Sequence, residues 1–182
     1  MTNPMVGRRA LPALIGTAGV TTTGPARAQA QAPRRASSLP HPTQSPLLTI
    51  SGKIQATNGD GVAKFDRPML NTMGSATIVT STPWHDGPVR FDGVPMAALM
   101  EAVRPTGDTV TAFALNDYSV DLPLSDFTRF GVLLATHKDG APMRVRDQGP
   151  LFIIYPFDSA LELRTRLYYD RSAWSVVQLI IR

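Results

Sequence analysis

Two arginines and one aspartate stand directly before a short, strongly apolar run. Arg144, Arg146 and Asp147 lie in a polar turn that is followed by Gly149-Pro150 and by the uncharged residues 151–156. An uncharged run that follows a Gly-Pro pair predicts a buried strand. Guanidinium groups at the mouth of a rigid strand can bind a carboxylate or a phosphate bidentately. The turn is therefore a candidate for a site that binds a small anionic ligand.

The same turn also has a purely structural interpretation. Arg146 and Asp147 could pair with other loops as an ion bridge, and the sequence favours neither this role nor ligand binding. Gly149 could serve the backbone turn rather than touch a ligand. The sequence alone does not decide between a structural role and ligand binding for these residues.

Three hydroxyl side chains precede a tryptophan at a second place in the chain. The segment reads Thr80-Ser81-Thr82-Pro83-Trp84 and begins at the end of a predicted strand. A neutral hydroxyl would need deprotonation before it could ligate a metal, so we expect Thr80, Ser81 and Thr82 to bind no metal. Their hydroxyls could satisfy backbone groups at the strand end, or they could contact a ligand together with Trp84.

A third polar segment, Asn116-Asp117-Tyr118, lies between two predicted strands. Asn and Asp are common turn residues, and Tyr118 could be a core residue whose hydroxyl is satisfied. Contact with a ligand is the alternative. We count all three residues as candidates for ligand binding.

Several kinds of chemistry are excluded by residue types that the sequence lacks. It contains no cysteine, which excludes disulfides, thiolate nucleophiles and Cys-ligated zinc or iron–sulfur sites. His41, His85 and His137 do not have the spacing of a metal site. No Gly-rich phosphate loop, Gly-x-Ser-x-Gly turn or His-Glu-x-x-His motif occurs. An acid–base hydrolase would rest only on scattered carboxylates.

Short strands and brief helices must position these segments. Asp66 and Pro68 predict the start of a short helix, and the apolar spacing over residues 94–103 predicts a second one. A helical turn is expected at 125–130 and a hairpin at Asp139-Gly140. The predicted strands are residues 47–54, 76–81, 89–92, 109–115, 118–122, 132–136, 151–155 and 174–181. Strands dominate, which predicts a single, β-rich α+β domain with mixed or antiparallel sheet and short helices.

The first thirty residues are typical of an export signal. Arg8-Arg9 precedes a weakly apolar run, and Ala28-Gln29-Ala30 offers a cleavage site, as in a twin-arginine signal peptide. An ordinary Sec signal or a basic tail is the alternative. Residues 31–45 are rich in proline and predict a flexible linker, so 46–182 would form the folded domain. We expect a soluble periplasmic protein, because no segment is apolar over the ~20 residues that a membrane-spanning helix needs.

The charge of the folded part argues against nucleic acid as a partner. The chain has 18 basic and 14 acidic residues, a net charge of +4. Arg8, Arg9 and Arg27 would leave with the signal, which leaves 15 basic against 14 acidic residues, or +1. A nearly neutral domain lacks the basic surface that binding to phosphate backbones requires.

The order of these elements, together with Thr80–Trp84, Asn116–Tyr118 and the Gly-Pro-Leu strand, resembles the molybdopterin-binding domain of the sulfite oxidase family. The resemblance covers roughly residues 46–182 and extends to small exported proteins described as molybdopterin-dependent-oxidoreductase-like. It implies the sulfite oxidase fold, a possible molybdopterin cofactor, and a pocket that the Asn116–Tyr118 turn faces.

Two positions depart from the resembled family. A cysteine before the tryptophan supplies the thiolate to molybdenum in that family, and Thr80 or Ser81 lies nearest that place here. The family's basic residue after Gly-Pro-Leu is Phe152 here. Molybdenum favours soft thiolate donors, so metal ligation is expected to be absent or atypical.

Two functions follow from these observations. The first is an exported, oxidoreductase-like domain that binds a pterin or a small anion. The second is a non-catalytic periplasmic sensor or binding module for a small ligand or a partner protein. In both cases we expect the three polar segments to meet at one concave surface.

Overall fold

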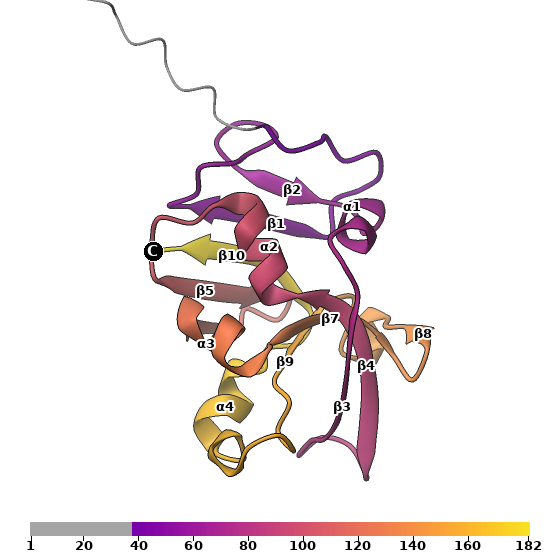
Figure 1. Ribbon diagram of the computed structural model, residues 1–182. Helices are drawn as coiled ribbons and strands as arrows, with labels where there is room; N and C mark the ends of the chain where they lie inside the picture. Colours follow the sequence, from indigo (N-terminus) through magenta and orange to yellow (C-terminus); the bar gives the residue numbers. More distant parts are fainter. Residues whose placement is uncertain (1–37) are drawn as a thin grey trace, which may run out of the picture. The chain divides into compact units, whose positions relative to one another are not determined.

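The computed structural model describes residues 38–182, which fold as the β-rich α+β domain that the sequence predicts (Figure 1). The expected signal peptide at 1–30 lies outside the described residues. The strands are β1 (Leu48–Gly52), β2 (Ala63–Phe65), β3 (Ala76–Ser81), β4 (Pro88–Pro95), β5 (Thr109–Ala114), β6 (Ser119–Pro123), β7 (Leu133–Lys138), β8 (Ala141–Pro142), β9 (Phe152–Ile154) and β10 (Val176–Ile181). The α-helices are α1 (Arg67–Thr72), α2 (Met96–Val103), α3 (Leu124–Phe130) and α4 (Arg166–Arg171).

Two sheets organise the domain. One has the order β2-β1-β10-β5-β6, and the other has the order β3-β4-β7-β8, with β9 paired to β7. Only the β1–β10 pair is parallel among the ladders of the described residues, and the remaining pairs are antiparallel. The domain therefore combines mixed and antiparallel sheet, as expected.

The four α-helices of the described residues are six to eight residues long, and helices this short depend on tertiary contacts for their stability. In α2 the buried residues are Met96, Leu99, Met100 and Val103, a spacing of three and four that places them on a single side. In α1, Asp66 is the N-cap, and its Oδ1 accepts a hydrogen bond of 2.9 Å from the Met69 amide. The predicted cap is confirmed.

The strand that begins after Gly149-Pro150 lies in the interior. Leu151 to Tyr155 are all 0% exposed, and β9 pairs with β7 on one side. On its other side the amide of Ile153 donates to the Ala173 carbonyl at 2.9 Å. β9 thus links its sheet to the segment that leads from α4 into β10.

Three features differ from the expected elements. The three-residue β2 and the helix α4 were not expected, because β2 is very short and Arg166–Arg171 has no side-chain N-cap bond and no buried residue. The last strand begins at Val176 instead of residue 174, because Ser175 has a φ of 54°, which breaks the extended backbone.

The described part of the expected linker is bound to the domain. The amides of Thr43 and Gln44 donate to Asp66 Oδ2 at 2.6 and 2.8 Å, and the Leu39 amide donates to the Thr57 carbonyl at 2.9 Å. Residues 38–45 are therefore ordered by backbone contacts that no composition rule predicts. Within residues 38–182, no helix is long and apolar enough to cross a membrane.

Candidate ligand-binding site

A cavity of about 360 Å³ lies between the loop after β3, the β5–β6 hairpin and α4. Four of its ten lining residues are aromatic, and we call it the aromatic cavity. Its lining residues are Pro83, Trp84, Asn116, Tyr118, Arg166, Tyr169, Asp170, Ser172, Ala173 and Trp174. A concave, mostly apolar site with few polar groups is the usual form of a small-molecule pocket.

Trp84 lines this cavity and is the centre of an aromatic cluster. Its ring lies 5.5 Å from that of Trp174 and 6.2 Å from that of Tyr169, at interplanar angles of 76° and 78°. Phe152 and Phe157 pack on it from the interior, at 5.8 and 6.2 Å between ring centroids. The loop that carries Trp84 is therefore fixed by packing rather than by backbone pairing.

Tyr118 connects the hairpin to the helix on the opposite wall. Its hydroxyl donates to the Asp170 carbonyl at 2.8 Å, although the side chain is 41% exposed. Asp117, at the tip of the turn, has a φ of 62° and is exposed. Asn116 and Tyr118 thus line the aromatic cavity, while Asp117 shapes the turn without lining it.

A second hollow of about 410 Å³ adjoins the first and shares Asn116 and Trp174 with it. Its other lining residues are Leu115, Val145, Arg146, Gln148 and Ser175. We call it the basic cavity, because Arg146 is its charged residue. The side chain of Arg146 is 70% exposed, and its nearest carboxylate in the described residues, that of Asp147, is 3.9 Å away.

Asp147 is engaged by a different arginine. Arg144 Nε donates to Asp147 Oδ2 at 2.8 Å, and this bond is the main cause that holds the pKa of Asp147 below its usual value. Neither Arg144 nor Asp147 lines the cavities. Arg144 and Asp147 thus form an ion pair within the turn, whereas Arg146 lines the basic cavity.

Gly149 is buried and has a backbone role. Its amide donates to the Arg144 carbonyl at 2.8 Å. A Cβ at this position would lie 2.5 Å from the carbonyl of Met143. Gly149 therefore closes the turn that presents Arg146 and does not line either cavity.

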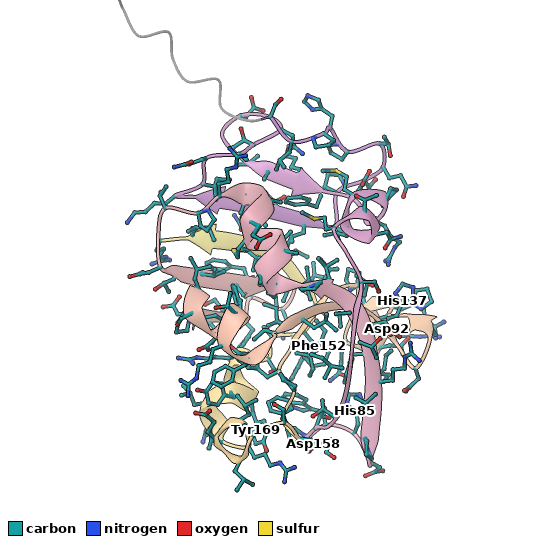
Figure 2. The ribbon with its side chains drawn as sticks, in the orientation of Figure 1. His85, Asp92, His137, Phe152, Asp158 and Tyr169 are labelled. Atoms are coloured by element: carbon teal, nitrogen blue, oxygen red, sulfur yellow. The ribbon has the colours of Figure 1, made fainter. Side chains whose placement is uncertain are left out.

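The hydroxyl segment borders a third, smaller hollow of about 290 Å³, which shares Pro83 and Tyr169 with the aromatic cavity. Ser81, Thr82 and Asp158 are among its lining residues. Figure 2 labels Asp158 and Tyr169, which both line this hollow, and Phe152, which is buried. The aromatic cavity thus shares lining residues with each of the other two hollows, and each of the three polar segments lines at least one hollow.

Thr80 itself is fully buried and does not face the row. Its Oγ1 accepts a hydrogen bond of 3.1 Å from the Asp158 amide. In return, the Ser81 amide donates to Asp158 Oδ2 at 2.6 Å. The hydroxyl of Thr80 thus satisfies a backbone group, which is the structural role considered for this segment.

Several lining residues were not expected from the sequence. Tyr169 and Arg166 lie on α4, which has no strong helix signal, and Trp174 stands just before the break at Ser175. The paired tyrosines of Arg166–Arg171 and the second tryptophan of the chain are the available signals. The sequence alone does not show that these residues line one cavity together with Trp84.

His85 lies in the same loop as Trp84 and is held at both ring nitrogens. Nδ1 is 2.8 Å from Thr82 Oγ1, and Nε2 is 3.2 Å from Lys138 Nζ. Because an ammonium only donates, the neutral ring accepts at Nε2 and donates from Nδ1. Burial lowers the pKa of His85, Lys138 lowers it further, and Asp139 and Gln148 oppose the shift.

This environment predicts an acid-sensitive fold. The unfolded chain binds a proton at His85 near pH 6.5, but the folded domain resists that proton, so stability should fall as the pH decreases through this value. We expect His85→Gln to show a smaller loss of unfolding free energy than the wild type between about pH 7.5 and about pH 5.5. Urea unfolding at both pH values measures the two losses, and equal losses would contradict the assignment.

No group of three or more His, Cys, Asp or Glu side chains in residues 38–182 is placed to hold a metal ion. The expectation of no metal ligands among the candidate residues stays a prediction.

Comparisons with known proteins give the fold a family context. The family model described as "Oxidoreductase molybdopterin binding domain" matches residues 65–160. The solved structure of the sulfane dehydrogenase SoxCD from Paracoccus pantotrophus matches with a TM-score of 0.56 and 16% sequence identity, over 79% of this chain and 39% of that chain. This chain thus spans about two fifths of that protein, and the likeness concerns the fold alone. No curated protein sequence matches the chain.

Proposed function

Because this chain belongs to the family of oxidoreductase molybdopterin-binding domains, we propose that it is a binding module that keeps the family's fold without its molybdenum chemistry. In this proposal the aromatic and basic cavities hold a small ligand. The alternative is an oxidoreductase-like domain that still carries molybdopterin. The metal-ligating groups that the chain offers favour the binding module.

The observation that carries the proposal is the environment of Thr80. In the resembled family this part of the loop supplies a thiolate to molybdenum, and this chain has no cysteine at any position. The Thr80 hydroxyl is buried and already accepts the Asp158 amide. Ligation by Thr80 would require loss of its proton and of this hydrogen bond. Ser81, the other residue near the place of the thiolate, is exposed and offers only a neutral hydroxyl, a poor donor to a metal that favours soft thiolates. The residues present therefore do not fit a molybdenum centre.

Phe152 supports the same conclusion independently. It stands where the resembled family has a basic residue that grips the cofactor, and it is 0% exposed. Its ring packs against Phe91 at 5.7 Å and against Trp174 at 6.1 Å. In this proposal Phe152 packs in the core, where the family's basic residue would contact the anionic cofactor.

We include in the proposal that the protein acts outside the cytoplasm. Support comes from the Arg8-Arg9 pair and the Ala28-Gln29-Ala30 site in the sequence. A binding module at that location would take its ligand from the periplasm or pass a signal to a partner protein there.

The test is the molybdenum and pterin content of the full-length protein. It should be expressed in cells that also make a catalytic member of the family, which shows that the cofactor is being supplied, and recovered from the exported fraction. We expect substoichiometric molybdenum by mass spectrometry and no pterin fluorescence after oxidation. Stoichiometric molybdenum would reject the proposal, and a pterin without the metal would favour the alternative.

A further inference from the structure

Taking the proposed binding role as its basis, we propose that the ligand is a small aromatic acid, with its ring in the aromatic cavity and its carboxylate on Arg146. The two cavities differ in chemistry and share two lining residues, so one molecule that lies over both would have two chemically different ends.

Continuity comes from shared walls. Asn116 and Trp174 line both hollows, whose volumes are about 360 and 410 Å³. Ligand pockets in proteins usually measure roughly 300–1,000 Å³. A molecule with one or two rings and a short acidic side chain can therefore lie across Trp174 with a different part in each hollow.

The ring end is set by the orientation of the aromatic side chains. The rings of Trp174 and Tyr169 are nearly perpendicular to that of Trp84. An aromatic ligand can therefore contact the face of one ring and the edge of another, and stacked and edge-to-face contacts are the arrangements that aromatic pairs prefer. The large apolar side chains Leu115, Tyr118 and Val145 are 53%, 41% and 60% exposed around these same hollows. Exposed apolar groups gathered at a cavity indicate a surface that an apolar ligand covers.

The acidic end is set by the charge balance around Arg146. Arg144 and Arg146 face one carboxylate, that of Asp147, which leaves a local charge of +1. Since Arg144 holds Asp147 at 2.8 Å, the guanidinium of Arg146 keeps its donors for another anion. Such a guanidinium can bind a carboxylate through two parallel hydrogen bonds.

A cationic ligand is the competing inference, because aromatic walls also bind ammonium groups. The charges decide against it. In the aromatic cavity Asp170 is paired with Arg166 at 3.5 Å, so that rim is neutral. The unbalanced charge at the joined hollows is then that of the Arg144–Arg146 turn, and it is positive.

The experiment uses the only two tryptophans of the sequence, Trp84 and Trp174, which both line the aromatic cavity. The full chain is titrated with phenylacetate, its neutral amide phenylacetamide, the amine phenethylamine and acetate, while tryptophan fluorescence is recorded. We expect a saturable change with phenylacetate, about tenfold to hundredfold weaker binding of the amide, because one charge-assisted contact is lost, and no response to acetate. Arg146→Gln should reduce phenylacetate to the affinity of the amide and leave the amide unchanged.

Arg129→Gln is the matched control, because Arg129 is a similarly exposed arginine that pairs with Glu162 and lines neither cavity. It should bind phenylacetate like the wild type. No saturable response to phenylacetate, equal binding of phenethylamine, or unchanged phenylacetate affinity in Arg146→Gln would each overturn the inference. These outcomes concern the ligand class alone, whereas the molybdenum content decides the proposed function.

Discussion

Asp126→Ala should lower the free energy of unfolding by about 3–5 kcal/mol, the usual loss when one partner of a buried ion pair is removed. Asp126 Oδ2 accepts hydrogen bonds from the Tyr155 hydroxyl and from Arg171 Nη1, both at 2.8 Å. The side chains of Asp126 and Arg171 are only 8% and 17% exposed, and Tyr155 is fully buried. The substitution would leave a cation and a hydroxyl without their acceptor. Urea unfolding of both proteins measures the difference.

An exposed ion pair provides the control. Arg129 and Glu162 approach to 2.9 Å, but their side chains are 60% and 47% exposed. Glu162→Ala should therefore cost about 0.2–1 kcal/mol. If Asp126→Ala cost no more than Glu162→Ala, the three buried groups would not form the energetic unit that their distances indicate.

The same three groups hold the wall of the aromatic cavity. Asp126 lies on α3, Tyr155 follows β9, and Arg171 ends α4, the helix that carries Tyr169. Burial and the neighbouring Asp126 carboxylate raise the pKa of Tyr155, so its hydroxyl stays a donor. Loss of Asp126 should consequently loosen α4 before it affects the sheets.

Phe152→Lys should be at least as damaging as Phe152→Ala, which is expected to cost about 3–5 kcal/mol as a large-to-small core substitution. The lysine would restore the type of residue that the resembled family carries there. Phe152 is enclosed by Trp84, Phe91 and Trp174, however, and an ammonium in that position would lose its hydration without gaining a partner. Unfolding free energies from urea titrations test this order.

Phe152→Leu completes the series, since it keeps most of the apolar volume and should cost less than either variant. If Phe152→Lys instead folded with nearly wild-type stability, the surroundings of residue 152 would still tolerate a basic side chain. The core around this position would then not have been repacked against such a residue.

Most of the fold follows from local patterns. Alternating and uncharged runs predict the strands around residues 76–81, 109–115 and 151–155, and Asp66 with Pro68 predicts α1. These signals are local because the side-chain period and the cap chemistry act within a few residues. Helix α4 has no such signal: Arg166–Arg171 has no side-chain cap, and the helix is held by the distant Asp126.

The candidate site can be predicted only in part, because local patterns do not show which distant residues the fold brings together. Trp84, Asn116, Tyr118 and Arg146 were recognised by residue type at predicted strand ends, and all four line the cavities. The sequence could not decide between Arg144 and Arg146, because the choice depends on which guanidinium the turn directs at Asp147.

The Asp158 carboxylate has a consequence beyond the site. Strand β3 is the last strand of its sheet, carries no charged residue, and exposes Val79 by 61%. An uncharged edge strand of this kind is a template for pairing with another chain and for aggregation. Ser81 lies opposite Pro88 of β4, but its amide donates to Asp158 and so faces the open side of the strand. Alternate residues of a strand direct their backbone groups to the same side, so those of Val79 and Thr77 face this open side as well. The carboxylate occupies the place that the carbonyl of an added strand would need at Ser81, so intermolecular pairing at this end of β3 requires displacement of Asp158 from the Ser81 amide.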